Sequence, residues 1–273
     1  ESTMEVGVLE TAIGGMSLTG FAFDRCDVGV CLNIAAEHMS GQGGIYSVDG
    51  VATRKRQVIE RTSGTAVLNA DDPRCLAMRD HTQAQQIVLV ARSASHPAIT
   101  RHCEAGGTAV VIDPPGEAEG RLCICDSAGI TPLLALDEIP ATMHGRASYN
   151  AENALFAAAA AMGLGLAREV IIAGLRSFTM SKEHTPGRMN VFDGLPFQVF
   201  LDYAHNAHGI KAFCDFSDQL PVAGRRIMVL MAVGDRSDAE IEANAAAAAG
   251  SFDVFLCRDA SAQRRRMRGR NPG

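Results

Sequence analysis

Short apolar segments of strand length alternate along the chain with segments of helical periodicity. The apolar segments cover residues 4–9, 27–32, 65–68, 86–91, 108–112, 197–203, 226–233 and 253–257. Helical patterns cover residues 47–62, 150–162, 167–177, 207–219 and 238–249. Continuous apolar strands that alternate with helices are typical of a parallel sheet buried on both faces. The pattern therefore predicts an α/β fold.

Two segments interrupt this alternation. Residues 91–146 carry short β-like runs, several Gly and Pro residues and little helical periodicity, which predicts a β-rich insertion or sheet edge. Residues 178–188 (FTMSKEHTPGR) are mostly polar and contain a Pro-Gly pair, after which a new strand–helix series begins. We therefore place a domain boundary near residue 183, with one domain over residues 1–183 and a second over residues 184–273.

Length, charge and cysteine content narrow the class of protein. A chain of 273 residues is long enough for one large or two modest domains, and its net charge of −6 argues against a nucleic-acid-binding protein. The longest apolar or Gly stretch, residues 154–167, is shorter than the roughly 18 residues that a membrane-spanning helix needs. No secretory leader is visible, and the eight cysteines contain no CxxC motif, so we expect reduced core thiols in a cytoplasmic protein.

Polar residues follow several of the predicted strands. In doubly wound sheets, ligands bind beyond the carboxyl ends of the strands, so these positions are candidates for function. They are Glu10, Asn33 with Glu37 and His38, Asn69 with Asp71 and Asp72, the run from Asp202 to Asn206, and Gly234 with Asp235 and Arg236.

Glu10 and His38 follow two different predicted strands and are candidate metal ligands. Mg²⁺ prefers oxygen ligands and keeps several waters, so one or two protein carboxylates are enough to hold it beside a phosphate. The alternative is structural: Glu10 and Glu37 cap helices, and His38 is an ordinary core or loop histidine.

The run Asp202-Tyr203-Ala204-His205-Asn206 precedes a predicted helix. Asn206 is well suited to the N-cap of that helix. Asp202 and His205 then remain available for a ligand such as a ribose hydroxyl. For Gly234-Asp235-Arg236, a turn with a helix cap is an equally acceptable interpretation.

Several nucleotide-binding and hydrolase motifs are missing from the sequence. A P-loop needs a Lys followed by Ser or Thr, but Lys55, Lys182 and Lys211 precede Arg, Glu and Ala. The chain also contains no GxSxG motif, no HExxH motif and no GxGxxG after a strand.

Ordered motifs along nearly the whole chain resemble the Mur-ligase-like part of the cyanophycin synthetase family. They are VLETAIGG at 8–15, FDRCDVGV at 23–30, Asn33-Ile34 with Glu37-His38, VLNADDP at 67–73, Tyr149-Asn150 with ENAL at 152–155, PGRMN at 186–190, LDYAHN at 201–206, Gly234-Asp235-Arg236, and Arg268-Gly269-Arg270 with Pro272-Gly273. Each motif is weak by itself, but their joint specificity is high.

The resemblance implies a particular fold and extent. The chain would hold the later part of a Mur-type central ATPase domain, followed by an incomplete Rossmann-like C-terminal domain. It begins where the family has already passed its P-loop, and the match stops before the family's final segment. We therefore expect a fragment that is inactive as an isolated polypeptide.

The resemblance also implies an activity, that of an ATP-dependent acid–amino-acid ligase. In such enzymes a carboxylate attacks the γ-phosphate, and an amine converts the acyl phosphate to an amide. For this family the Mur-like half adds arginine to the aspartate side-chain carboxyl of a poly-aspartate backbone, whereas a separate ATP-grasp part adds aspartate. We expect no nucleic-acid or membrane partner, and a homo-oligomer for the full-length enzyme.

By similarity to the family, individual residues receive roles. Glu10 and His38 would bind Mg²⁺, Lys55 and His205 would be catalytic, and Asn150 and Asn153 would lie near the adenine of ATP. Arg188 would contact nucleotide phosphate and Asp202 the ribose. The alternatives are a helix N-cap for Asn150 and, for Lys55, a solvated helix lysine between Arg54 and Arg56.

Five arginines crowd near the end of the sequence: Arg264, Arg265, Arg266, Arg268 and Arg270. Such a run is compatible with a solvated face, a polyanion patch or a phosphate-binding loop. Because its Arg-Gly-Arg ending matches a family loop, the resemblance implies that Arg268 and Arg270 contact substrate. Guanidinium groups bind phosphate and carboxylate bidentately.

Departures from the family keep two other hypotheses open. Ile13 stands where the family usually has Arg, and Glu37 replaces the usual Asp beside His38. The first alternative is a Mur-family ligase that joins another amino acid to another carboxylate. The second is a degenerate, non-catalytic nucleotide-binding or assembly module.

Overall fold

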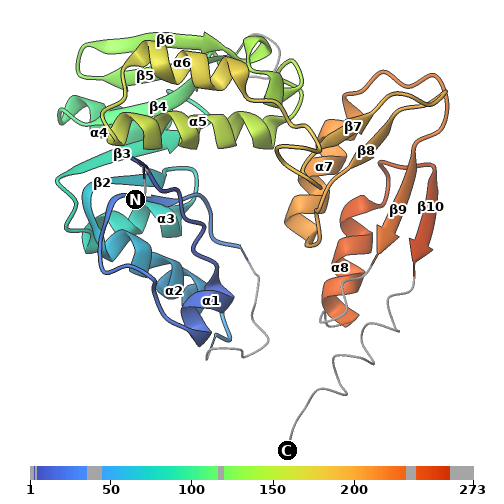
Figure 1. Cartoon of the computed structure of the whole chain (residues 1–273), viewed down its shortest axis with the longest axis horizontal. Coiled ribbons are helices and arrows are strands. Elements are labelled where there is room, and N and C mark those ends of the chain that lie inside the picture. The colour runs from blue at the N-terminus through green and yellow to red at the C-terminus, as the bar shows by residue number, and fades with distance from the viewer. Residues whose placement is uncertain (1–2, 4, 36–44, 116–119, 232–237, 259–273) are drawn as a thin grey trace, which may run out of the picture. The chain divides into compact units, whose positions relative to one another are not determined.

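The computed structural model describes residues 3, 5–35, 45–115, 120–231 and 238–258. The chain divides into two compact units, each described by itself here (Figure 1). Unit 1 comprises Glu1–Ile139 and Asn150–Ser177, and unit 2 comprises Pro140–Tyr149 and Phe178–Gly273. The domain ranges 1–183 and 184–273 stay a prediction, since the segment Pro140–Tyr149 joins the second unit although it lies well before residue 183.

A six-stranded sheet forms the centre of unit 1, with the strands in sequence order from β1 to β6. Its strands are β1 (Cys26–Cys31), β2 (Thr62–Asn69), β3 (Gln86–Ala91), β4 (Thr108–Asp113), β5 (Arg121–Asp126) and β6 (Gly129–Ala135). The first four are parallel, and β5 and β6 continue the sheet in antiparallel pairing. The expected parallel sheet and β-rich edge are thus both present.

Both faces of the parallel part are buried, which explains why its strands are continuously apolar. Successive side chains of a strand point to opposite faces, so Leu68 and Leu89 share one face while Val67 and Val88 share the other. The first face packs on Ile59 and Ile99 among other residues of the flanking helices. All of these side chains are 5% exposed or less.

The helices of unit 1 connect and cover the strands. They are α1 (Ile13–Leu18), α2 (Val48–Glu60), α3 (Pro73–Ala77), α4 (Pro97–Glu104), α5 (Ser148–Gly163) and α6 (Arg168–Ser177), with short 3₁₀ turns η2 (Met78–His81) and η3 (Leu136–Glu138). The last residue of α5, Gly163, lies against β2: a Cβ added there would stand 2.9 Å from the Thr65 Cβ. Among the described residues, no helix combines the length and apolar content needed to cross a bilayer.

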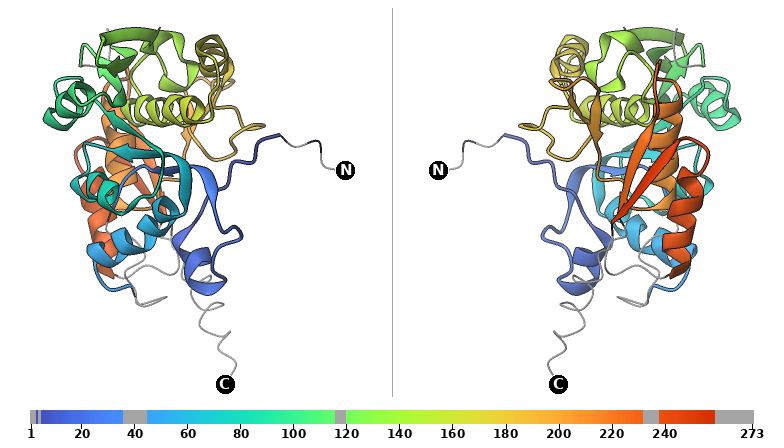
Figure 2. Two further views of the ribbon diagram at one scale, coloured as in Figure 1. Left: turned by 90° about the vertical axis from the view of Figure 1, so that its left-hand side faces the viewer. Right: turned by 90° about the vertical axis from the view of Figure 1, so that its right-hand side faces the viewer.

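Unit 2 contains two small sheets and two main helices. Its elements are η4 (Pro140–Thr142), β7 (Asn190–Phe192), β8 (Val199–Leu201), α7 (Ala207–Asp218), β9 (Ile227–Met231), α8 (Asp238–Ala248) and β10 (Val254–Arg258). The strands β7 and β8 are antiparallel, whereas β9 and β10 are parallel. The right-hand view of Figure 2 shows β9 and β10 side by side with α8 next to them. Buried Ile210, Cys214 and Ala248 form the core beneath this pair of strands.

One predicted strand was wrong, and one helix was missed within a segment that had been interpreted as β-rich. Residues 5–9 form neither helix nor strand, because a strand needs a partner, and in the described part of the chain none lies beside them. The apolar side chains Val6 and Val8 are consequently exposed. Helix α4 was missed because residues 91–146 were interpreted as β-rich. Pro97 at its first position and the His96 side chain, whose Nδ1 accepts a hydrogen bond from the Ala98 amide at 3.2 Å, begin the helix.

Candidate functional site

The loop that follows β1 is held at its backbone by side chains from neighbouring elements. Asn69, at the end of β2, donates from Nδ2 to the Leu32 carbonyl at 2.6 Å. Lys55, on α2, donates from Nζ to the Asn33 carbonyl at 3.2 Å. These contacts satisfy two carbonyls that the β ladder no longer pairs once the strand has ended.

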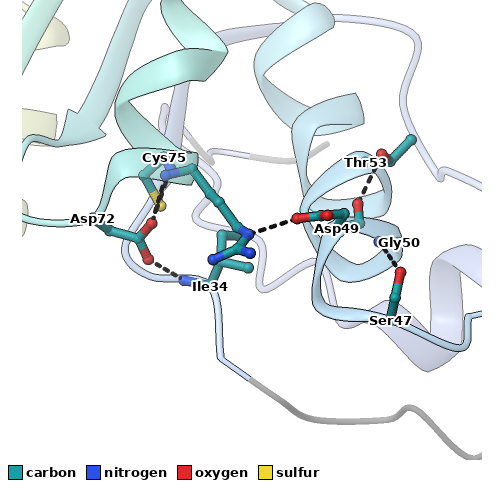
Figure 3. Close-up of polar contacts among 8 residues, drawn as sticks. Ile34, Ser47, Asp49, Gly50, Thr53, Asp72 and Cys75 are labelled. Carbon is teal, nitrogen blue, oxygen red and sulfur yellow. Dashed lines mark hydrogen bonds and ion pairs between the residues drawn. The ribbon is translucent and has the colours of Figure 1, made fainter.

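Asp72 holds the next residue of the same loop (Figure 3). Its Oδ2 accepts a hydrogen bond from the Ile34 amide at 2.7 Å. Its Oδ1 accepts from the amides of Arg74 and Cys75 at 2.9 and 3.2 Å, which makes Asp72 the N-cap of α3. One carboxylate therefore joins the loop after β1 to the start of α3, directly before the segment that carries Glu37 and His38.

The position of Lys55 differs from that of a fully solvated lysine. Its side chain is half-buried and donates to the loop after β1, while the neighbouring Arg56 pairs with Glu60 at 2.7 Å on the helix surface. The structure thus places the Lys55 ammonium at the strand end where the sequence predicted a catalytic group. Its catalytic role stays a prediction.

Glu10 is exposed and lies in a segment without regular secondary structure, not directly after a strand. It does not cap the following helix, because the N-cap of α1 is Ala12 and no side chain caps it. His38 and Glu37 lie outside the described residues. In the described ranges, no three His, Cys, Asp or Glu side chains gather closely enough to hold a metal ion. A lone exposed carboxylate nevertheless fits Mg²⁺, which can keep most of its ligands as water.

Asn150 and Asn153 lie in the first turns of α5. Asn150 is buried, and its Oδ1 accepts a hydrogen bond from Asn153 Nδ2 at 3.2 Å, while Asn153 itself is exposed. Because α5 already begins at Ser148, Asn150 is inside the helix, and the N-cap interpretation of this residue was wrong. The proposed contact with adenine is untested by this geometry.

A tightly held loop in unit 2 presents Arg188. Buried Asn190 organises it: its Oδ1 accepts from the Gly187 amide at 2.7 Å, and its Nδ2 lies 3.0 Å from the Thr185 carbonyl and 3.2 Å from that of Arg188. Gly187 has a φ of +76° and Met189 one of +49°. A left-handed backbone at a non-glycine residue such as Met189 is uncommon and often marks a functional loop.

Asp202 fastens this loop to the end of β8. Its Oδ2 accepts a hydrogen bond from the Met189 amide at 3.0 Å, and its Oδ1 accepts from the Ala204 amide at 2.8 Å. Each carboxylate oxygen carries two lone pairs, so Asp202 keeps capacity for a ligand hydroxyl. Within the described part of the chain, the buried hydroxyl of Tyr149 has no hydrogen-bond partner, and burial, followed by the Asp202 charge, raises the pKa of this phenol.

Three exposed or half-buried side chains line up beside Asp202. The Arg188 guanidinium lies 5.4 Å from the centre of the Tyr203 ring, a cation–π contact, and the Tyr203 and His205 rings meet edge to face at 5.5 Å. The Nδ1 atom of His205 is 3.0 Å from the Tyr203 carbonyl. The sequence-predicted residues Arg188, Asp202 and His205 are therefore neighbours in unit 2. Asn206 caps α7, as predicted, by accepting from the Gly209 amide at 2.8 Å.

The remaining predicted site residues lie in unit 1 or outside the described residues. Glu10, Lys55, Asn150 and Asn153 belong to unit 1. Besides Glu37 and His38, the predicted residues outside the described part of the chain are Gly234, Asp235, Arg236, Arg264, Arg265, Arg266, Arg268 and Arg270.

Sequence reasoning gave Asn190 and Tyr149 no role, and it named Asp72 only as one of several polar residues that follow a strand. Asp72 could have been found, since an Asp directly before Pro is a typical helix start. Asn190 bonds to backbone groups two to ten residues before it, but only the folded loop brings these groups together, and the burial of the Tyr149 hydroxyl likewise depends on the fold.

Comparison with known proteins gives consistent matches over both units. Residues 1–161 match the family model of the Mur ligase middle domain, and residues 187–270 match that of the Mur ligase glutamate ligase domain. Cyanophycin synthetases of Synechocystis and Nostoc are 39% and 38% identical over 98% of this chain. The chain spans only 30% and 29% of the length of these relatives.

Solved structures share the fold at low sequence identity. A UDP-N-acetylmuramoylalanyl-D-glutamyl-2,6-diaminopimelate–D-alanyl-D-alanyl ligase of Acinetobacter baumannii matches with a TM-score of 0.57 and 20% identity, over 90% of this chain and 48% of that one. A folylpolyglutamate synthase of Mycobacterium tuberculosis, solved with ADP and AMPPCP, matches with a TM-score of 0.59 and 20% identity, over 85% and 48%.

Proposed function

Because the chain belongs to the Mur ligase family, we propose that the natural protein containing it is an ATP-dependent ligase that joins a carboxylate to an amine. The ligases among its relatives and its α/β fold support this reaction class. The substrates we propose are arginine, as the amine, and the side-chain carboxyl of aspartate in a poly-aspartate backbone. The identity of 39% to a cyanophycin synthetase supports this choice.

The proposed reaction has two steps. An oxygen of the aspartate carboxylate attacks the γ-phosphorus of ATP, the bond to the β,γ-bridging oxygen breaks, and ADP leaves. The α-amine of arginine then attacks the acyl carbon, phosphate leaves with the carboxylate oxygen, and the amine loses a proton. Phosphoryl transfer of this kind depends on positioning and charge neutralisation rather than on a covalent catalyst.

One observation carries the proposal furthest: unit 2 presents Arg188 on a loop that Asn190 and Asp202 hold in place. Because the backbone of this loop is already fixed, phosphate binding does not have to order it. The Arg188 guanidinium can then pair with two phosphate oxygens at once. Asp202, with lone pairs to spare, would accept a ribose hydroxyl. His205 contacts Tyr203, the ring that Arg188 also contacts, and from there it would orient a bound group or exchange a proton with it.

Residues of unit 1 receive proposed roles of their own. Lys55 would supply a positive charge at the end of β1, and Asn153, which is exposed, would approach the adenine. Glu10 and His38 would hold Mg²⁺, which supplies charge neutralisation on the phosphates when bound. Arg268 and Arg270 would contact the polymer or its amino-acid substrate through their guanidinium groups.

The test is turnover by the natural protein at its full length. We expect ADP and a new amide only when ATP, Mg²⁺, arginine and an aspartate polymer are all present. Arg188→Ala should weaken nucleotide binding about tenfold to a hundredfold, since a charge-assisted contact contributes roughly 1.5–3 kcal/mol. Arg225→Ala, which removes an exposed arginine of the same unit, is the matched control and should leave binding unchanged.

Ile13 supports a second candidate within the same reaction class. It is 5% exposed and packs with Met16, Ile45 and Val51, so in this chain the position makes an apolar contact where the family usually has a charged one. A ligase for another amino acid would form ADP with that amino acid and not with arginine. Nucleotide binding without any amide product would instead favour the non-catalytic module.

A further inference from the structure

Two cysteines far apart in the sequence meet at the end of β1. Cys31 is the last residue of β1, and Cys75 lies in α3. Their Sγ atoms are 3.4 Å apart, and the side chains are 4% and 0% exposed. No function proposed above uses either thiol.

The surroundings make the two thiols unequal. The hydrogen bond between the two sulfur atoms lowers the pKa of the Cys31 thiol, Lys55 acts in the same direction, and burial and Asp72 oppose them. The pKa of Cys75 is raised by the same hydrogen bond and by burial. Of the two thiols, Cys31 is therefore the one whose ionisation the contact between the sulfur atoms favours.

Cys103 also has a cysteine partner, since it forms a hydrogen bond with Cys125, but the pKa of its thiol shifts in the opposite direction from that of Cys31. Burial is the main reason why the pKa of Cys103 is raised to about 12, and it also raises the pKa of Cys123 and of Cys214. A thiolate is the reactive form of cysteine, so these residues should be inert inside the protein. Cys257, in contrast, is exposed on β10.

We propose that Cys31 and Cys75 are a redox-sensitive pair that hydrogen peroxide converts to a reversible intramolecular disulfide. The contact between the two sulfur atoms and the placement of one on a strand end and the other on a helix carry this inference. It does not depend on the proposed ligase activity.

The chemistry balances with one peroxide as the two-electron oxidant. The Cys31 thiolate attacks a peroxide oxygen, the O–O bond breaks, and hydroxide leaves, which gives a sulfenic acid on Cys31. The Cys75 sulfur then attacks the Cys31 sulfur, the S–O bond breaks, and the oxygen leaves as hydroxide, which takes up the Cys75 proton to give water. A dithiol reductant breaks the S–S bond between Cys31 and Cys75 by thiol–disulfide exchange and restores both thiols.

Burial decides the partner and the rate. Peroxide is small, but both sulfurs are covered, so oxidation of the pair should be slower than that of Cys257. Once Cys31 is a sulfenic acid, Cys75 is the thiol in contact with it, so the product should be intramolecular. A disulfide has an S–S distance of about 2.05 Å, so the bond draws the end of β1 toward α3.

This movement would act on the loop after β1. Asp72 caps α3 and holds the Ile34 amide, and Lys55 holds the Asn33 carbonyl. The disulfide therefore lies beside the contacts that hold Asn33 and Ile34, and we expect oxidation to shift the backbone of these two residues.

The test maps the cross-link in the natural protein. Protein with all thiols reduced is treated with hydrogen peroxide, first until Cys257 is oxidised and then for a longer period. The remaining free thiols are alkylated, and the protein is denatured and digested with trypsin. Cleavage after arginine and lysine releases residues 26–54 and 75–79, and a linked pair of these peptides, lighter by two hydrogen atoms, is the expected product. Dithiothreitol should return both peptides.

Three variants assign the link and control it. Residues 26–54 also contain Cys26, so Cys26→Ser should keep the cross-link if Cys31 forms it. Cys75→Ser should abolish the cross-link and leave a Cys31 sulfenic acid that dimedone traps. Cys214→Ser should change nothing. The inference is overturned if wild-type Cys31 and Cys75 both remain free thiols after prolonged exposure, or if the cross-link uses Cys26.

Discussion

Asp72 in unit 1 and Asp202 in unit 2 form the same kind of hydrogen bonds to backbone amides, but their surroundings differ. Each carboxylate accepts the amide of a distant loop residue, Ile34 or Met189, and an amide two residues further along its own chain. Both Asp72 oxygens accept hydrogen bonds, one from the start of α3 and one from the loop after β1, beside a sheet buried on both faces. Asp202 stands beside an exposed arginine and near a buried hydroxyl that has no partner. The comparison indicates that the first is a structural anchor and that the second retains room for a ligand.

The largest effect should come from the strained loop that Asp202 holds. Met189 is fully buried, so Met189→Ala should lower the free energy of unfolding by about 2–5 kcal/mol, measured by urea denaturation. Its φ of +49° is costly for any side chain but not for glycine. Met189→Gly should therefore be about 1 kcal/mol more stable than Met189→Ala.

The order of these two variants is the informative result. At a position with negative φ, a glycine variant of a protein is less stable than the alanine variant, since glycine loses more backbone entropy on folding. If Met189→Gly were the less stable of the two, the left-handed conformation of the loop would be contradicted.

The next effect concerns the anchor in unit 1. Asp72→Ala removes the N-cap of α3 and leaves the Ile34 amide without its acceptor, so it should lower the free energy of unfolding by about 1–3 kcal/mol. Asp80→Ala, at an exposed position nearby, should change it by less than about 0.5 kcal/mol. Equal effects of the two substitutions would mean that Asp72 is no anchor.

A smaller effect of opposite sign is expected beside Asp202. Tyr149→Phe removes a buried hydroxyl without a hydrogen-bond partner, so the unliganded protein should keep its stability or gain up to about 1 kcal/mol. Tyr46→Phe, at an exposed tyrosine, should be neutral. Thermal unfolding of both variants beside the wild type measures this, and a clear loss at Tyr149 would show that the hydroxyl has a partner in the folded protein.

The smallest effect should be a pH dependence at the surface of unit 1. The Arg176 guanidinium and then the Ala135 amide, as hydrogen-bond donors, lower the pKa of the exposed Glu138 carboxyl. Ionised Glu138 therefore stabilises the folded protein fully above the pKa that this carboxyl has in the unfolded chain, about 4.3. This contribution disappears as the pH falls through the lower pKa of the folded state. Glu138→Gln should be slightly less stable than wild type at pH 7, and urea denaturation at about pH 3 should show the difference shrinking.

The sequence allowed the sheet to be predicted better than the contacts that hold the site. Residues 86–91 were predicted as a strand with the same bounds as β3, because an apolar run of this length is typical of a buried strand and too short for most helices. Residues 4–9 have a similar apolar character but no partner strand, and periodicity cannot show whether a partner exists.

The same distinction applies to the candidate site. Asn206 was predicted as an N-cap from local order alone and is one. The link from Asp72 to Ile34 spans 38 residues and that from Asp202 to Met189 spans 13, so neither follows from local patterns. Both arise only once the sheet and the loop before β7 have brought their backbones together.

Oxygen transfer tests the proposed acyl-phosphate chemistry most directly. The natural protein at full length would be given ATP, Mg²⁺, arginine and an aspartate polymer whose side-chain carboxylates carry ¹⁸O, and the released phosphate would be analysed by mass spectrometry. Attack of the carboxylate on the γ-phosphorus predicts one ¹⁸O atom in each phosphate that accompanies an amide bond. Amide formation with unlabelled phosphate would contradict it.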